Sequence, residues 1–139
     1  MIDFDSFLLE YKNKLAKIFK KERETSEEAM ERGISEENLT NILKSIPLAS
    51  FIPSEYGGFG GHTAEALSVL EASSYESLPL SLMMGINGAL FLQPIANYGS
   101  EEAKNDIFSR VINKTKMGGL MITEPNYGSE ALKMQTSVE

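Results

Sequence analysis

The feature that most constrains this 139-residue chain is the distribution of its positive charges. No Lys or Arg occurs between Pro47 and Ser100, although the flanking segments together contain all 13. Within this stretch the run LSLMMGINGALFL is apolar on nearly every side of a helix. A helix of that kind is typical of a buried position. The sequence therefore predicts that a helix over residues 80–93 is the most buried element of a helical bundle, with the charged outer helices facing solvent.

Periodicity and capping residues predict the remaining elements. Helices are expected over residues 3–24 and 25–32 (capped by Thr25 or Ser26), and after Ser35, near Thr63, and after Ser77 and Ser100. Pro94 should break or kink the central helix, and LMIT, residues 120–123, predicts a strand after Gly118 and Gly119. The side chains expected to face the core are Phe4, Phe7, Leu8, Tyr11, Leu15, Ile18, Phe19, Leu39, Ile42, Leu43, Ile46, Leu67, Leu70, Tyr75, Ile107, Phe108 and Val111.

Composition excludes several classes of protein. The absence of cysteine excludes disulfides and thiolate metal sites, and the single histidine, His62, leaves no histidine cluster, so no metal site is expected. A net charge of −7 argues against nucleic-acid binding. The first residues do not resemble a secretory signal, and no window approaches the ~18–20 unbroken apolar residues of a membrane span. These features favour a cytoplasmic protein without a membrane span.

Three motifs in the second half of the chain resemble the flavin-dependent acyl-CoA dehydrogenases. IPSEYGGFGG is similar to that family's Ile-Pro-Glu-Glu-Tyr-Gly-Gly-Leu-Gly-Gly loop. PIANYGSEEAKNDIFSRV is similar to its Pro-Ile-x-x-x-Gly-Thr-Glu-Glu-Gln-Lys segment, and MITEPNYGSE to its Thr-Glu-Pro-x-Ala-Gly-Ser-Asp loop. The resemblance covers roughly residues 40–139, and it rests on three motifs at the right separations.

The resemblance implies an all-α fold: the amino-terminal helical bundle of this family over residues 1–117, with a short β tail over residues 118–139. That tail would be the start of the family's middle β-domain, so the chain resembles a fragment or a truncated member. The implied reaction is α,β-dehydrogenation of an acyl-CoA thioester in fatty-acid or amino-acid catabolism. FAD is the implied cofactor, electron-transfer flavoprotein the electron acceptor, and a homo-oligomer the assembly. The catalytic carboxylate belongs to the family's carboxy-terminal domain, so no catalytic residue is expected here.

The loop over residues 123–129 is the first candidate site. Its hydroxyls, loop N–H groups and glycine suit polar or anionic edges of a ligand. The resemblance assigns FAD binding to Leu120, Met121, Ile122, Thr123, Gly128 and Ser129, with Ser129 also near the substrate's thioester-pantetheine or phosphate groups. Tyr127 and Glu130 depart from the family's small residue and Asp, and Tyr127 either crowds the site or faces solvent. The alternative is a plain turn between two strands.

The central helix supplies the second candidate site. Aligned on Pro94 and Gly99, the family's acyl-lining positions fall at Leu82, Met83 and Ile86, all apolar as a fatty acyl chain requires. The alternative is ordinary core packing at helical spacing.

Other functions remain open. One alternative is a non-catalytic helical module that binds a partner or oligomerises, and another is an acyl-CoA oxidase or flavin monooxygenase. The glycine loop is expected to be a structural connection and His62 a solvated loop residue. Glu55 and Glu124 are possible bases by chemistry but lack a partner that would tune their pKa. Residues 1–139 alone are expected to lack turnover and to hold FAD weakly, and unpaired edges of the predicted strand would favour dimers through the tail.

Overall fold

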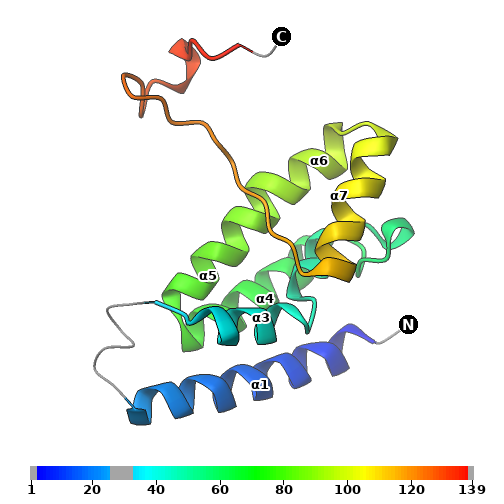
Figure 1. The fold of residues 1–139 in the computed structure, drawn as a ribbon. Helices are drawn as coiled ribbons and strands as arrows, with labels where there is room; N and C mark the ends of the chain where they lie inside the picture. Colours follow the sequence, from blue (N-terminus) through cyan, green and yellow to red (C-terminus); the bar gives the residue numbers. More distant parts are fainter. Residues whose placement is uncertain (1–2, 26–32, 138–139) are drawn as a thin grey trace.

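The computed structural model, which describes residues 3–25 and 33–137, is a bundle of helices followed by an extended tail (Figure 1). The all-α fold is confirmed, and these residues contain no sheet. The α-helices are α1 (Phe4–Thr25), α3 (Glu36–Leu43), α4 (Thr63–Glu76), α5 (Leu78–Gly85), α6 (Gln93–Tyr98) and α7 (Glu101–Lys114). The other helical segments are η1 (Pro47–Phe51), η2 (Ser54–Tyr56), η3 (Ile86–Leu92) and η4 (Ala131–Lys133), of which η3 is π-helical and the rest are 3-10 helices.

Serine side chains begin three of the helices where the sequence predicted. The hydroxyls of Ser35, Ser77 and Ser100 each accept a hydrogen bond from the backbone N–H three residues later, which satisfies a donor at the start of the helix. α3 ends at Leu43, earlier than expected, because Ile46 adopts a left-handed conformation (φ 52°) before η1 begins at Pro47. The helix predicted over residues 25–32 lies outside the described residues, apart from Thr25, which ends α1.

The core forms where α1 packs on α4 and where η1 packs between α4, η3 and α7. The prediction that Leu67 and Tyr75 face inward was wrong, because they are 58% and 84% exposed. The inward face of α4 carries small residues instead, which allows α1 to approach closely. The fully or nearly buried apolar side chains are Phe7, Tyr11, Leu15, Phe19, Ile42, Leu43, Leu48, Phe51, Ile52, Ala66, Val69, Ala72, Leu80, Met84, Leu92, Phe108 and Val111.

The glycine loop over residues 56–61 is a structural connection, as expected. A Cβ on Gly58 would lie 2.0 Å from the carbonyl oxygen of Ile52, so no larger residue fits there. The turn places Phe59 against Phe7 of α1, with ring centroids 4.7 Å apart. On the other side, Tyr56 Oη donates a 2.7 Å hydrogen bond to Glu101 at the start of α7. The loop therefore joins the first helix to the last one.

The central helix continues from Leu78 to Tyr98, so of the break or kink predicted at Pro94 the break is absent, and the kink stays a prediction. A proline ring clashes with the carbonyl four residues earlier in an α-helix. Here the π-helical segment η3 precedes it, and Gln93 N–H bonds to Gly88 O, five residues back. This wider turn accommodates Pro94 within a continuous helix.

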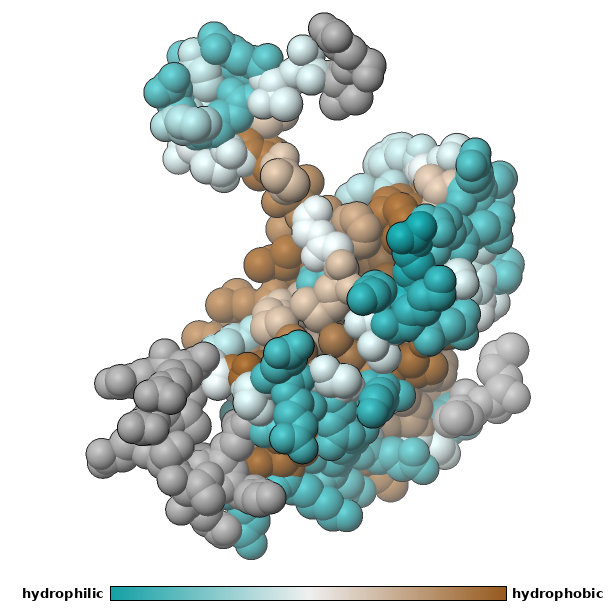
Figure 2. Space-filling model, viewed as in Figure 1, coloured by the Kyte–Doolittle hydropathy of each residue, from teal (hydrophilic) through white to brown (hydrophobic). Residues whose placement is uncertain are grey.

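The prediction that this helix is the most buried element of the bundle was wrong, because all five residues of η1 are buried whereas 28% of the central-helix window is. Leu80, Met84 and Leu92 are fully buried. Four side chains at four-residue spacing are instead 43–65% exposed and form one row along the helix: Leu78, Leu82, Ile86 and Leu90. Figure 2 shows hydrophobic residues gathered along this helix and the tail segment that crosses it. By length and composition alone, the helix from Leu78 to Tyr98 is long and apolar enough to cross a membrane, which is weak evidence for a span and leaves the sequence expectation of no span as a prediction. One face of the helix therefore packs into the core, and another is uncovered apolar surface.

The tail beyond α7 is extended but unpaired. Residues 116–123 form no strand, and the described part of the tail contains a single isolated bridge between Glu124 and Tyr127. The strand predicted over residues 120–123 is therefore absent, because no neighbouring strand among the described residues supplies the hydrogen bonds that a sheet requires. The expectation of dimers through the tail stays a prediction.

Candidate functional site

The predicted flavin loop stands clear of the helical bundle (Figure 1). Met121 is 99% exposed, and Leu120 and Ile122 are 47% and 41% exposed. Thr123, Gly128 and Ser129 are exposed as well. The loop therefore presents apolar side chains and polar groups together on one accessible segment.

A tight turn organises the loop around Glu124. Backbone hydrogen bonds of 3.1 Å run in both directions between Glu124 and Tyr127. The Glu124 carboxylate also accepts the N–H groups of Gln135, at 3.0 and 3.1 Å, and of Thr136, at 2.7 Å. Hydrogen bonds from Thr136 and Gln135 lower the pKa of Glu124. This carboxylate is fixed as an acceptor that closes the loop, which makes it a poor proton-abstracting base.

Tyr127 packs within the loop. Its side chain is half-buried, and its Oη lies 3.3 Å from Gln135 Nε2, which donates to it. The sequence left two placements open for Tyr127, in which it either crowds the site or faces solvent. In the structure its side chain packs against the loop itself and does not extend freely into solvent. The larger residue at this position therefore serves the turn itself.

The polar groups predicted to meet the cofactor are available. In the described part of the chain, the hydroxyls of Thr123 and Ser129 make no hydrogen bond. A Cβ built on Gly128 would meet no atom within 4 Å, so the backbone there is open to a ligand. These groups have the chemistry to hold a flavin ring edge or a phosphate along one side.

The predicted acyl-lining residues lie on the uncovered face of the central helix. Leu82 and Ile86 are 58% and 43% exposed, and Met83 is half-buried. Core packing, the alternative reading, therefore does not explain Leu82 or Ile86. Residues four apart share a helix face, so these side chains continue into the exposed row formed with Leu78 and Leu90. That row offers one apolar wall.

The tail meets the central helix at a residue that sequence reasoning missed. Asn87 is 3% exposed, and its Oδ1 accepts a 2.7 Å hydrogen bond from Gly118 N–H. Its Nδ2 donates a 2.9 Å hydrogen bond to the carbonyl oxygen of Met83. The available signal was an amide in an otherwise apolar run, since a buried polar side chain in such a run needs partners. The two predicted sites are thus linked through one side chain.

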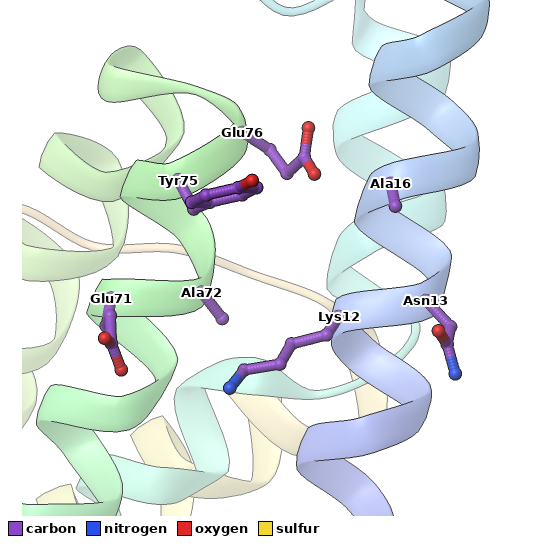
Figure 3. Close-up of a pocket in the computed structure, with 7 residues that line it drawn as sticks. All are labelled: Lys12, Asn13, Ala16, Glu71, Ala72, Tyr75 and Glu76. Carbon is purple, nitrogen blue, oxygen red and sulfur yellow. The ribbon is translucent and has the colours of Figure 1, made fainter.

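A separate groove lies between α1 and α4 (Figure 3). It encloses about 370 Å³, and Lys12 reaches across it from α1 toward α4. The small side chains of Ala16 and Ala72 leave open space between the two helices, and Tyr75 and Glu76 border this space. The groove contains none of the predicted cofactor or substrate residues.

Comparison with known proteins gives the class. The sequence model of the family "Acyl-CoA dehydrogenase, N-terminal domain" matches residues 10–115 of this chain. The chain therefore belongs to the acyl-CoA dehydrogenase family, as a chain that carries its N-terminal domain. No solved structure matches the chain significantly.

Individual relatives refine this picture. The chain is similar to a short-chain specific acyl-CoA dehydrogenase of Megasphaera elsdenii, with 29% identity over 84% of this chain and 32% of the relative. It is 30% identical to an acryloyl-CoA reductase (NADH) of Anaerotignum propionicum, over 62% of this chain and 22% of that protein. It is 31% identical to the mitochondrial isovaleryl-CoA dehydrogenase of Bos taurus, over 63% and 20%. The chain spans about a third or less of the length of these relatives.

Proposed function

We propose that this chain is the N-terminal domain of an FAD-dependent enzyme that introduces the α,β-double bond into an acyl-CoA thioester. The observation that carries the proposal is the uncovered apolar face of the central helix at Leu82 of α5 and Ile86 of η3. A fatty acyl chain is best bound by an apolar wall that excludes water. The exposed row that contains Leu82 and Ile86 can supply such a wall. The tail that contacts this helix through Gly118 leads on to the polar groups of residues 123–129.

In this proposal the chain's own residues bind and orient the cofactor and the substrate. Thr123 and Ser129 donate hydroxyl hydrogen bonds to the cofactor, and the open backbone at Gly128 allows close approach. Ser129 also lies where the pantetheine or phosphate part of the substrate passes. Leu120, Met121 and Ile122 contribute the remaining contacts to FAD, which supplies the hydride acceptor when it is bound.

Proton abstraction is assigned to a carboxylate in the remainder of the whole protein. Within the described residues, Glu124 is occupied by three hydrogen-bond donor contacts and its pKa is lowered, so it is a weak base. Glu55 is exposed and its carboxylate makes no hydrogen bond in this part of the chain. The whole enzyme is proposed to be a cytoplasmic homo-oligomer that passes its electrons to an electron-transfer flavoprotein.

A reductase is the second candidate. It is favoured by the relative named acryloyl-CoA reductase (NADH), whose 30% identity to this chain lies between the 29% and 31% of the two dehydrogenases named above. The same apolar wall and flavin loop would serve reduction of an enoyl-CoA, so the direction of the reaction has to be measured.

The test uses the whole protein that carries this domain. Anaerobic addition of a straight-chain acyl-CoA should bleach the flavin absorption band, whereas NADH should not. A protein that NADH reduces and acyl-CoA does not is a reductase, and a protein that purifies without flavin and stays colourless with added FAD contradicts both candidates. Bleaching followed by oxygen consumption would instead identify an oxidase.

Two variants test the acyl wall. Ile86→Trp should reduce activity with long-chain acyl-CoA far more than with short-chain acyl-CoA, because bulk is added on the wall; Met83→Trp should act similarly. Leu67→Trp is the matched control, since Leu67 is a comparably exposed apolar residue on α4. Equal loss with both substrates, or the same profile in the control, would remove the helix face from the substrate site.

A further inference from the structure

Asn87 has an environment that core packing does not explain. It is the amide within the apolar run of the central helix, and only 3% of it is exposed. A buried amide is unfavourable unless its donor and acceptor are both paired. Both are paired here, to Met83 O at 2.9 Å and to Gly118 N–H at 2.7 Å.

The contact with the tail is close on a second side. A Cβ on Gly118 would lie 2.1 Å from Cε1 of Phe91, so the backbone of the tail rests directly on that ring. Asn87 and Phe91 are four residues apart and share a face of η3, next to the row that contains Ile86. We call Asn87, Phe91 and Gly118 the tail clamp.

The tail clamp joins two separate parts of the molecule. On one side lies the helix with Leu82, Met83 and Ile86, and on the other the segment that leads to Thr123. Only two residues separate Gly118 from Met121, whose side chain is 99% exposed. The direction in which the loop leaves the bundle is therefore set at this contact.

We propose that Asn87 is a positioning residue that fixes the loop over residues 120–129 relative to the acyl-lining face of the central helix. The inference rests on the proposed function. Asn87 touches neither cofactor nor substrate, and it acts through the backbone of Gly118. Loss of its acceptor releases the start of the loop, so the cofactor edge and the acyl chain lose their fixed separation while the apolar wall stays intact.

The first test needs only this chain and no ligand. The Gly118 amide should exchange with solvent deuterium about 10-fold faster in Asn87→Leu than in the native chain, because its acceptor is gone. Asn87→Asp keeps an oxygen facing Gly118 and should retain most of the protection. Unchanged exchange in Asn87→Leu would overturn the proposal.

Asn105→Leu is the matched control. Asn105 Nδ2 donates to Glu101 O at 2.7 Å, which is the same four-residue bond that Asn87 makes to Met83, but Asn105 is exposed and this amide bonds within α7 and not to the tail. Its replacement should leave Gly118 exchange unchanged. If Asn87→Leu does not fold, Gly118→Ala gives a second variant, whose added methyl displaces the tail from Phe91. Phe91→Ala in the same chain should restore Gly118→Ala if the clash is the cause, and failure to restore protection would count against the clamp.

The second test measures kinetics in the whole protein. Asn87→Leu should lower kcat about 10- to 100-fold while KM for acyl-CoA changes less than about threefold, since misplaced reacting groups cost rate rather than substrate binding. Asn87→Asp should recover part of kcat, and Asn105→Leu should match the native enzyme. A native protein without turnover refutes the proposed function even where Gly118 is protected. Native turnover with unchanged kcat in Asn87→Leu refutes the positioning role alone.

Discussion

Replacement of Tyr11 by Phe tests the contact that holds α1 on α4. The Tyr11 side chain is 1% exposed, and its Oη lies 2.9 Å from the Oγ of Ser73, which is fully buried. Ser73 Oγ donates to the carbonyl oxygen of Val69 at 2.7 Å, so Tyr11 is the donor in the bond between the two hydroxyls. Tyr11→Phe removes that donor and leaves Ser73 with its bond to Val69.

The two single variants should therefore differ in stability. Tyr11→Phe should lower the free energy of unfolding by about 1 kcal/mol, the typical net value of one hydrogen bond. Ser73→Ala should cost more, about 1–3 kcal/mol, because it strands the Tyr11 hydroxyl in the core without a partner. The double variant should lie close to Tyr11→Phe, since the stranded hydroxyl is then gone.

High pH gives the same contact a second, independent signature. Burial raises the pKa of Tyr11 to about 12, and the hydrogen bond with Ser73 offsets this rise only in part. In the unfolded chain the phenol titrates near 10, so the stability contributed by the neutral phenol is complete below pH 10 and is lost as pH rises toward 12. The loss is about 1.4 kcal/mol by pH 11. Tyr11→Phe lacks this loss, so its deficit at pH 7 should vanish or reverse by pH 11.

Urea unfolding followed by circular dichroism at pH 7, 10 and 11 measures all four chains. Taking the difference between the native chain and Tyr11→Phe removes contributions from other groups that titrate in this range. A deficit of Tyr11→Phe that stays constant from pH 7 to pH 11 would refute the buried, neutral phenol. A Ser73→Ala variant as stable as the native chain would refute the pairing.

Three further predictions concern the loop, the exposed face and the isolated chain. Gly58→Ala should lower the free energy of unfolding by about 1–3 kcal/mol in urea titrations, since its Cβ would meet Ile52 O at 2.0 Å; an unchanged midpoint would contradict the tight turn. Leu82→Ser should change stability by less than about 0.5 kcal/mol and reduce binding of a hydrophobic dye, whereas a large loss would mean that the side chain is core. Residues 1–139 alone should show no acyl-CoA turnover with an artificial acceptor and only weak FAD binding by fluorescence titration, because one loop cannot enclose the cofactor; turnover above the blank would require a base within the chain.

The helices could be predicted from the sequence because their signals are local. Ser35, Ser77 and Ser100 cap helices at the expected residues, and the apolar positions of α1 and α7 recur at helical spacing. The inward face of α4 could not be predicted from hydrophobicity, since it carries Ala72 and Ser73 while the larger Leu67 and Tyr75 face outward. Packing between helices decided that face.

The candidate sites show the same division. The residues of the loop and of the acyl wall followed from motifs, but their exposure did not. An apolar run predicts burial, yet it does not tell whether the surface that covers it belongs to this domain or lies outside it. Leu82 is left uncovered by the described residues. The bond between Asn87 and Gly118 joins residues far apart in sequence, which periodicity does not contain. The π-helical turn before Pro94 departs from the 3.6-residue period on which the helix prediction rests.

Covalent side-chain footprinting of the whole protein, with and without a bound acyl-CoA, tests the central claim most directly. The claim is that the exposed face of the central helix and the loop over residues 120–129 form this domain's share of the acyl-CoA and FAD site. Labelling of Leu82, Ile86 and Met121 should fall in the complex, while labelling of Leu67, exposed on α4, should stay constant. Bound acyl-CoA with unchanged labelling of all these residues, or with protection of Leu67 in place of Leu82 and Ile86, would contradict the account.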